Sequence, residues 1–495
     1  MNGYLPTRRQ TLQQLVGLTA LGAVNLLRAP RALAADAKTA IPGFKGQVIG
    51  RQDADYEIWR QSMVWHMSKP SRKPDLIVQA HSDADVVAAV KYAAQKKLKV
   101  AVRSGGHNSS WSAVRDGGIC IDMSAMDTIT IDKAAQIASI QSGVRSFDLV
   151  TTARDHGLSF PVPHCPSVGL GGFTMGGGMG WNWAQRGGFS TLSIQGAEVV
   201  LADGSQVKVG PKENPDLYWA LRGVGPGFFG VVTKLDLALY PAPKAIMASN
   251  YIFPIGDLPT VMAAMDEVRK KSDVSRVELI TVLMHHPEAP ADAPPDKSKI
   301  CFFSAFVFEA DEAAARKQLE PFAQSALAAK AVVKKEYMPF NFEGLYEHYF
   351  SLNDPAGRCA RYKVDNVLTN DGGKCLMALA EHFKTAHTRD YHILSAFNLH
   401  LKARPDSCLS ADADSFIGCY AIWDDEKDDP KAYDWLKKTL PLMDPFAVGH
   451  YINEIEATHP DRYRKCFSEQ NWKRLQDLRQ KYDPHGVFHN YLGVA

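Results

Sequence analysis

Residues 169–180, which read GLGGFTMGGGMG, constrain the fold more than any other segment, because seven of these twelve residues are glycine. Glycine lacks a Cβ, so it adopts positive φ angles at little steric cost and lets main-chain N–H groups approach a ligand closely. The sequence on both sides has the hydrophobic patterns of folded structure, so this segment is hardly a linker. We therefore expect it to line a binding site.

A glycine-rich segment first suggests a dinucleotide, but this one fits the Rossmann fingerprint poorly. That fingerprint places G-x-G-x-x-G between a strand and a helix, with an acidic residue about 20 positions later. Here the preceding residues, FPVPHCPSVG, contain three prolines and predict a loop. Two further glycine segments lie at 104–108 and 223–230. We expect all three segments to converge on one large polyanionic ligand.

The size and charge of the chain narrow the class of protein. At 495 residues it exceeds a typical single core, which stops growing near about 250 to 300 residues, so two domains are expected. Lysine and arginine total 56 and aspartate and glutamate 54, which gives a net charge of +2 and favours a small-molecule partner over nucleic acid. The eight cysteines form no C-x-x-C pair, so no metal site is expected. Disulfides such as Cys359–Cys375 and Cys408–Cys419 are possible, but the spacing alone does not decide which cysteines pair.

The hydrophobic pattern predicts a mixed α+β fold. From residue 74 it reads strand, helix, strand, with Ser82 as the helix cap, and short β-rich pieces follow. Pro241 and Pro243 end this part, and strands and helices of a second unit fill about 245–440. Residues 450–456, HYINEIE, predict a strand, and 468–482 a capped helix. We place the domains at 50–242, 243–442 and 443–495, the last returning to the first.

The N-terminal residues 1–34 have the order of a signal peptide. Arg8 and Arg9 precede an apolar run from 15 to 27, and an Ala-x-Ala site lies at 32–34. The segment resembles a twin-arginine signal, although Thr11 stands where an aromatic residue is usual. It predicts a periplasmic or secreted protein, and the alternative is an amphipathic first helix. The apolar run is too short for a stable membrane span.

Four motifs together resemble a known family. VRSGGH (102–107), HCPSVGLGGFTMGGGMG (164–180), DLYWALRGVGPGFFGVVT (216–233) and the terminal YIN…KYDPHGVF are similar to the FAD-linked oxidases of the berberine bridge enzyme type, within the vanillyl-alcohol oxidase superfamily. The resemblance covers about 55–490 and is weakest in the middle. It implies an α+β fold, with an FAD-binding domain of two α+β subdomains and a substrate domain built on a mostly antiparallel sheet with flanking helices.

The resemblance also implies how the cofactor is held. His107 would bond to the 8-methyl carbon of FAD and Cys165 to a neighbouring ring carbon, and both residue types can act as nucleophiles towards an electron-poor ring. The alternatives are a surface-loop histidine and a structural thiol. The expected cofactor-binding residues are Arg103, Ser104, Gly105, Gly106, His107, Asn108, Cys165, Val168, Gly169, Gly172, Gly176, Gly180, Gly230, Val232 and Asn453; plain turn chemistry is the other explanation of the glycines.

Three positions bear on the reaction. Val168 occupies the place where valine accompanies oxidase behaviour in plant relatives, which favours O2 as acceptor. Phe173 stands where those relatives often have histidine, so another group must stabilise the reduced flavin. Tyr451, in the Y-x-N pattern with Asn453, is the expected base for the substrate hydroxyl, although an unperturbed tyrosine pKa near 10 must be lowered for that role. Tyr451 could instead be an aromatic core residue.

The function expected from these residues is an exported oxidase that transfers hydride from an alcohol, a sugar or an aromatic alcohol to FAD and gives H2O2. The first alternative is a dehydrogenase that passes electrons to a periplasmic cytochrome or quinone. The second is a non-catalytic flavin-binding protein. The 243–442 unit, where specificity is expected to reside, holds polar aromatic residues but no single assignable contact.

Overall fold

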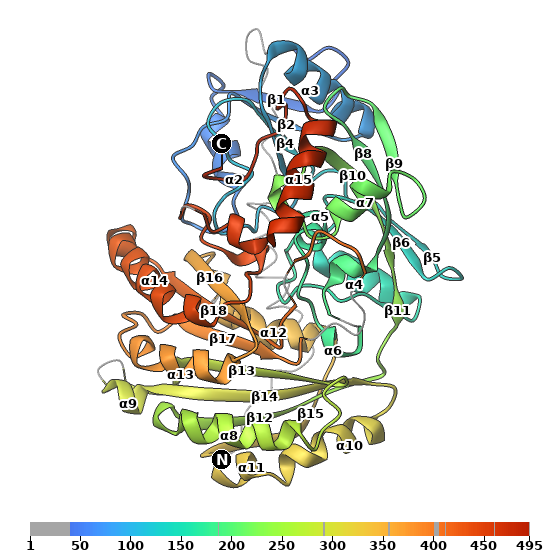
Figure 1. The fold of residues 1–495 in the computed structure, drawn as a ribbon. Coiled ribbons are helices and arrows are strands. Elements are labelled where there is room, and N and C mark those ends of the chain that lie inside the picture. The colour runs from blue at the N-terminus through green and yellow to red at the C-terminus, as the bar shows by residue number, and fades with distance from the viewer. Residues whose placement is uncertain are drawn as a thin grey trace.

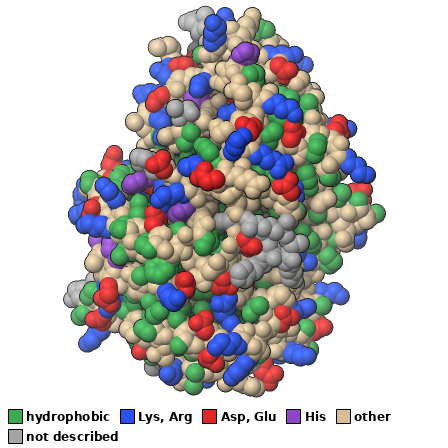
Figure 2. All heavy atoms as spheres, viewed as in Figure 1, with side chains coloured by type: hydrophobic (Ala, Val, Ile, Leu, Met, Phe, Trp, Pro, Cys, Tyr) green, Lys and Arg blue, Asp and Glu red, His purple; other side chains and the backbone are tan. Residues whose placement is uncertain are grey.

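The computed structural model describes residues 40–494 except 187, 291–292, 355–356, 400–404, 411 and 460. The predicted signal at 1–34 lies outside the described residues. Three main sheets build the molecule, and a seven-stranded sheet crosses the lower half of Figure 1 below the other two. On the face shown in Figure 2, positive and negative side chains are interspersed, in keeping with the small net charge.

The first sheet contains the predicted strand–helix–strand unit. Its order is β1 (Gln47–Gly50), β2 (Leu76–Gln79), β4 (Ile119–Asp122), β3 (Val100–Arg103), and β2 and β3 both run parallel to β4. Helix α3 (Asp83–Lys96) connects β2 to β3. It begins where the Ser82 side chain accepts a hydrogen bond from the Asp85 N–H, and it ends at Lys97 in the left-handed region. The loop 104–108 therefore starts at the carboxyl end of β3.

The second sheet is antiparallel. Its order is β5 (Ile129–Asp132), β6 (Ile137–Gln141), β10 (Val231–Ala238), β8 (Ile194–Val200), β9 (Gln206–Val209). Strands β7 (Leu158–Ser159) and β11 (Tyr240–Pro241) pair separately. The helices of this part are α4 (Ser146–Asp155), α5 (Leu170–Met175), α6 (Trp183–Arg186) and α7 (Pro215–Leu221), whereas α2 (Tyr56–Ser62) packs on the first sheet. The first half of the glycine-rich segment is thus helical.

The third sheet is antiparallel throughout. Its order is β15 (Val333–Phe340), β12 (Ala245–Pro254), β14 (Lys299–Glu309), β13 (Val277–His285), β17 (His392–Phe397), β18 (Ser415–Trp423), β16 (Arg361–Thr369). Alternate residues point to opposite faces of a strand. Helices α8 (Leu258–Arg269), α10 (Glu312–Ala323), α11 (Ala326–Lys330), α13 (Gly372–Phe383) and α14 (Asp429–Met443) cover one face, and the other packs on the glycine-rich part. The short helix α9 (Pro295–Ser298) and the longer helix α12 (Phe342–Asn353) complete this unit. The mixed α+β class and its antiparallel substrate sheet are confirmed.

The C-terminal residues return to the first two sheets. Helix α15 (Glu469–Tyr482) begins at Ser468, whose side chain accepts from the Asn471 N–H, and Phe488 bridges to Val100 on β3. The predicted strand at 450–456 is wrong, because residues 452–454 form a 3₁₀ turn, η7 (Ile452–Glu454). The Asn366 side chain on β16 forms the backbone hydrogen bonds that a neighbouring strand would otherwise form with these residues. Its amide donates to the carbonyls of Tyr451 (2.9 Å) and Glu454 (2.8 Å), and its oxygen accepts from Tyr451 N (2.8 Å).

Candidate functional site

The three glycine segments meet at one pocket of about 1910 Å³, including its open mouth. The loop at 104–108 touches the glycine-rich segment directly: a Cβ on Gly105 would lie 2.3 Å from the backbone nitrogen of Gly169. Gly225 and Gly230 add a third wall from the 223–230 segment. Glycine is required at the Gly105 contact, because two backbones could not approach this closely around a side chain.

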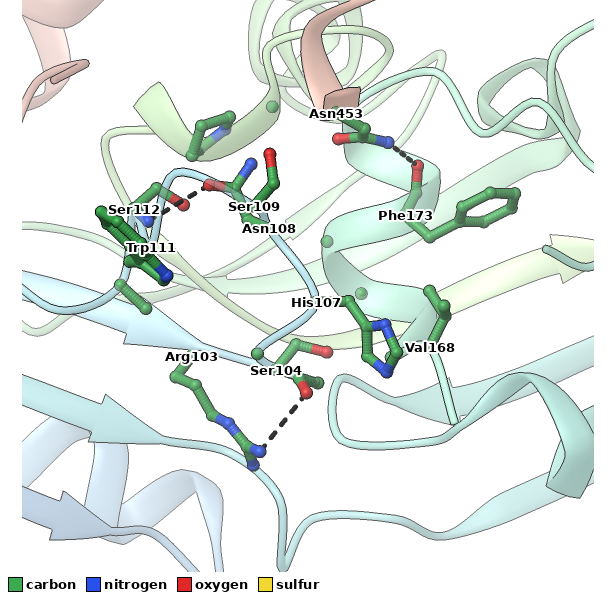
Figure 3. A pocket seen from close by; sticks show the side chains of 18 of the residues that line it. Arg103, Ser104, His107, Asn108, Ser109, Trp111, Ser112, Val168, Phe173 and Asn453 are labelled. Atoms are coloured by element: carbon green, nitrogen blue, oxygen red, sulfur yellow. Dashed lines mark hydrogen bonds between the residues drawn. The ribbon is translucent and has the colours of Figure 1, made fainter. Parts of the chain in front are cut away.

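His107 lies in this pocket beside Val168 (Figure 3). Its ring stacks on Trp65, with centroids 4.8 Å apart and planes inclined by 10°, and its Nε2 lies 3.0 Å from Ser167 Oγ. Burial lowers its pKa to about 3, and the charges of Arg103 and Arg145 act in the same direction. The imidazole is therefore neutral at neutral pH, the state in which a ring nitrogen is nucleophilic.

Cys165 lines the same pocket, but its thiol is protonated at neutral pH. Burial, together with the carboxyl groups of Asp354 and Glu454, raises the pKa of the thiol to about 12. All eight cysteines have free thiols, so neither disulfide that the spacing left open is formed. A bond from Cys165 to a cofactor requires a group that removes the thiol proton.

The loop at 104–108 has the donors of an anion cradle. The N–H groups of Gly105 to Asn108 have no backbone acceptor among the described residues, and the buried Ser109 hydroxyl has no hydrogen-bond partner there. Two predicted contacts take another role. The Ser104 hydroxyl donates to the Ser142 carbonyl (2.6 Å), and Arg103 pairs with Asp122 (3.0 Å), so both side chains brace the loop.

The predicted residues of the glycine-rich wall divide into two groups. Val168, Gly169, Gly172, Gly230 and Val232 line the pocket. Gly176 and Gly180 do not: a Cβ on Gly176 would lie 1.8 Å from Asn453 Oδ1, and one on Gly180 would lie 2.3 Å from the Pro161 carbonyl oxygen. These two glycines allow close packing of protein against protein, so their expected contact with a cofactor is corrected.

The pocket fits a flat cofactor with a pyrophosphate. A Cβ on Gly172 would meet nothing within 4 Å, so this part of the wall leaves space for a ring system. The unpartnered donors at 105–109 lie on the same pocket and suit an anion. His107 and Cys165 complete the set of residues expected for FAD.

The C-terminal turn packs directly against the glycine-rich segment, and Tyr451, Asn453 and Glu454 of this turn also line the pocket. Asn453 donates to the Phe173 carbonyl (Figure 3) and to the Tyr451 hydroxyl, each at 3.0 Å. The Tyr451 hydroxyl also accepts from Met179 N at 3.1 Å. Burial raises the pKa of Tyr451 above its usual value, so the phenol is neutral. Tyr451 as the base stays a prediction, and its raised pKa opposes that role.

Several pocket residues were missed in the sequence. Trp65, Ser167, Tyr362, Tyr420 and Glu454 all contact predicted site residues or line the pocket. Ser167 lies within the 164–180 motif and Glu454 directly follows Y-I-N at 451–453, and their polarity in an apolar context was the available signal. Nothing in the sequence near Trp65, Tyr362 and Tyr420 marks them, because strands and loops distant in the chain bring them to the site.

The comparisons with known proteins agree with this geometry. Residues 74–210 match the family described as FAD binding domain, and residues 450–495 match the family described as berberine and berberine like. The chain is an FAD-dependent oxidoreductase. It is similar to the FAD-linked oxidoreductase janO of Penicillium janthinellum, with 26% identity over 438 residues that cover 87% of this chain and 93% of the relative.

Two further similarities concern one kind of enzyme. Over 212 residues, 43% of this chain and 45% of the relative, the oxidoreductase is 37% identical to (R)-6-hydroxynicotine oxidase of Paenarthrobacter nicotinovorans. The solved structure of 6-hydroxy-D-nicotine oxidase from Arthrobacter nicotinovorans superimposes with a TM-score of 0.78, at 21% identity, over 92% of this chain and 100% of that chain. At this identity the superposition establishes the fold.

The described residues contain neither a cluster of metal ligands nor a helix that could span a membrane. Among them, no three histidine, cysteine, aspartate or glutamate side chains are grouped as metal ligands. In the same part of the chain, no helix has the length and hydropathy of a membrane span.

Proposed function

We propose that the oxidoreductase binds FAD covalently through His107 and Cys165. The neutral imidazole of His107 supports this, because the stack on Trp65 and the Ser167 contact fix its ring at the pocket wall. Cys165 lines the same pocket, and the Glu454 carboxyl there, which raises the pKa of the thiol, is the group that we propose takes the thiol proton during attachment. Two bonds would retain the cofactor in a pocket that is open to solvent.

We further propose that the enzyme oxidises an alcohol, a sugar or an aromatic alcohol, with O2 as acceptor and H2O2 as product. FAD supplies the hydride acceptor when bound and returns the electrons to O2. The observation that carries this function is the composition of one pocket: His107 and the glycine segments form one side, and Tyr362, Leu394 and Tyr420 of the seven-stranded sheet form the other. The small side chain of Val168 beside His107 supports access of O2.

Stopped-flow spectroscopy of the purified holoenzyme tests this function. Anaerobic mixing with a panel of alcohols, sugars and aromatic alcohols should bleach the flavin absorbance for at least one class. Mixing the reduced enzyme with air-saturated buffer should restore the absorbance rapidly and release H2O2. Slow reoxidation in air, with fast reoxidation by a cytochrome or a quinone analogue, would instead identify a dehydrogenase. Absence of bleaching across the panel would support a binding protein.

The N-terminal residues lead to a proposal on localisation. We propose twin-arginine export to the periplasm or medium, supported by Arg8, Arg9 and the Ala-x-Ala site at 32–34. Export of a folded protein suits an enzyme that takes up its cofactor before transport. Cell fractionation of the wild type and of an Arg8→Lys, Arg9→Lys variant tests this. Equal amounts of mature protein outside the cytoplasm would overturn it.

A further inference from the structure

Glu454 is a carboxylate in the pocket that the sequence motifs did not assign to any role. It ends the η7 turn, whose backbone Asn366 fixes at Tyr451 and at Glu454 itself. Its Oε2 accepts a hydrogen bond of 2.6 Å from the Tyr420 hydroxyl on β18. No described residue donates to Oε1, so this oxygen is available to a molecule in the pocket.

The surroundings of Glu454 are uncharged. His392 stacks on the far side of Tyr420, with ring centroids 4.5 Å apart, and burial keeps that imidazole neutral by lowering its pKa to about 4. No cation of the described residues acts on Glu454, and burial raises its carboxyl pKa to about 7, although the Tyr420 hydrogen bond acts to lower it. Its titratable neighbours come from four elements: Tyr420 on β18, Tyr362 on β16, Tyr451 on the same turn and Cys165 on the 160–169 segment.

We infer that Glu454 is the catalytic base that takes the proton from the substrate as its C–H bond is oxidised. This inference rests on the proposed function. The O–H or N–H bond of the substrate breaks, and its proton passes to Glu454 Oε1. The neighbouring C–H bond breaks with its electron pair, the hydrogen leaves as hydride to FAD, and a C=O or C=N bond forms. The substrate loses two electrons and FAD gains two.

Glu454 suits this step better than Tyr451 does. A base is effective when its pKa lies near the working pH, because the deprotonated form is then populated while the group still binds the proton. Glu454 meets this condition, whereas burial raises the pKa of Tyr451 away from neutrality. The Tyr451 hydroxyl already accepts hydrogen bonds from Met179 N and Asn453 Nδ2. Tyr451 therefore positions the turn that carries Glu454.

The pocket around Glu454 also defines the class of substrate. On the sheet side the lining consists of the aromatic rings of Tyr362 and Tyr420 and the apolar side chains of Val364 and Leu394. A carbohydrate chain would leave many hydroxyl groups without partners against such a wall, at a cost for each buried group. The structure assigns a compact, ring-containing, mainly apolar substrate with one hydroxyl or amine group beside the oxidised carbon.

Anaerobic stopped-flow reduction of the holoenzyme tests the base directly. In the wild type the rate constant should fall about tenfold per pH unit below pH 6, because the carboxyl becomes protonated. Glu454→Gln should lower the rate by at least about 100-fold and abolish this pH dependence. Tyr451→Phe should retain the pH dependence. Tyr420→Phe should move it to higher pH, because the hydrogen bond that lowers the Glu454 pKa is lost.

Two results would overturn the inference. One is a Glu454→Gln rate within threefold of the wild type, and the other is a pH dependence that disappears in Tyr451→Phe instead. If Glu454→Gln fails to fold, Glu454→Ala with added formate replaces it, and the inference predicts partial recovery of the rate. If formate does not restore the reduction rate of a folded, flavin-loaded Glu454→Ala variant, this result counts against Glu454 as the base.

An infrared pH titration of the holoenzyme without substrate provides a readout independent of turnover. Other buried carboxyl groups, such as Asp365, also have raised pKa values, so the readout is the wild-type spectrum minus the Glu454→Gln spectrum. This difference should contain a protonated-carboxyl band that titrates near pH 7, and the exposed control Glu213→Gln should give no such difference band. Absence of the band from the Glu454→Gln difference would place the titrating carboxyl elsewhere and contradict the inference.

A substrate panel separates this inference from the proposed function. Aromatic alcohols and cyclic amines should reduce the flavin faster than mono- or oligosaccharides. Faster reduction by oligosaccharides would refute the substrate class and leave an FAD oxidase in place. Flavin that no compound reduces, in the wild type as in the variants, would instead refute the proposed function.

Discussion

The buried carboxyl of Glu454 makes the stability of the enzyme depend on pH in a way that one substitution should remove. Its pKa rises from 4.5 to about 7 on folding because the group is buried. The folded protein therefore binds more protons than the unfolded chain between these values, and stability falls as pH rises from about 4.5 through 7. At about 1.36 kcal/mol per pKa unit, ionised Glu454 costs about 3 kcal/mol at pH 8. Glu454→Gln carries no such charge.

The measurement is thermal unfolding of the holoenzyme at pH 4.5 and at pH 8. For a chain of this size about 3 kcal/mol corresponds to about 3 °C in Tm. The difference in Tm between Glu454→Gln and the wild type should therefore become about 3 °C more favourable to the variant at pH 8 than at pH 4.5. Glu213→Gln, at an exposed turn, is the matched control. A Tm difference that is the same at both pH values would refute the assigned ionisation of Glu454.

Three other substitutions test separate parts of the site. Gly172→Ala should fold, because its Cβ meets no protein atom and alanine favours the α5 helix by about 1 kcal/mol, but this variant should lose bound FAD. The control Gly256→Ala, whose Cβ also meets no protein atom, should keep FAD. Equal flavin absorbance in the two variants would contradict the placement of the ring system beside Gly172. Asn366→Ala should lower the free energy of unfolding by at least about 2 kcal/mol in a denaturant titration, because three hydrogen bonds to the 451–454 backbone are lost. An unchanged denaturation midpoint would show that these hydrogen bonds do not stabilise the turn. Val168→Leu should slow reoxidation of the reduced flavin by O2 and leave anaerobic reduction by the substrate unchanged. Unaltered reoxidation in stopped-flow traces would refute the proposed role of Val168 in the access of O2.

Local patterns in the sequence predicted the parts of the fold that depend on local interactions. The β2–α3–β3 unit follows from alternating and helical hydrophobic spacing, and Ser82 caps the helix as its side chain requires. The glycine content of three segments was enough to predict that they line one pocket, because a backbone without side chains can approach both another backbone and a ligand. His107 and Cys165 were assigned by motif and lie together in this pocket.

Interactions between distant segments explain what the sequence did not reveal. Residues 450–456 alternate like a strand, but the Asn366 side chain, 85 residues before Tyr451, binds their backbone and forces a turn. Gly176 looks identical to Gly172 in the sequence, yet one packs on Asn453 and the other faces the pocket. Glu454 acquires its raised pKa only when folding buries it, and its one side-chain partner, Tyr420, comes from the seven-stranded sheet. Hydrophobic spacing carries no information about such partners.

Mass spectrometry of flavopeptides from the acid-denatured protein tests whether His107 and Cys165 both bond to FAD. FAD should remain with the protein after acid precipitation, and proteolysis should yield a flavin that joins the peptide of His107 to the peptide of Cys165. A single adduct at His107 would retain the pocket and remove the role of Cys165. Release of all FAD into the acid supernatant would contradict the account, because the pocket would then hold its cofactor without either bond.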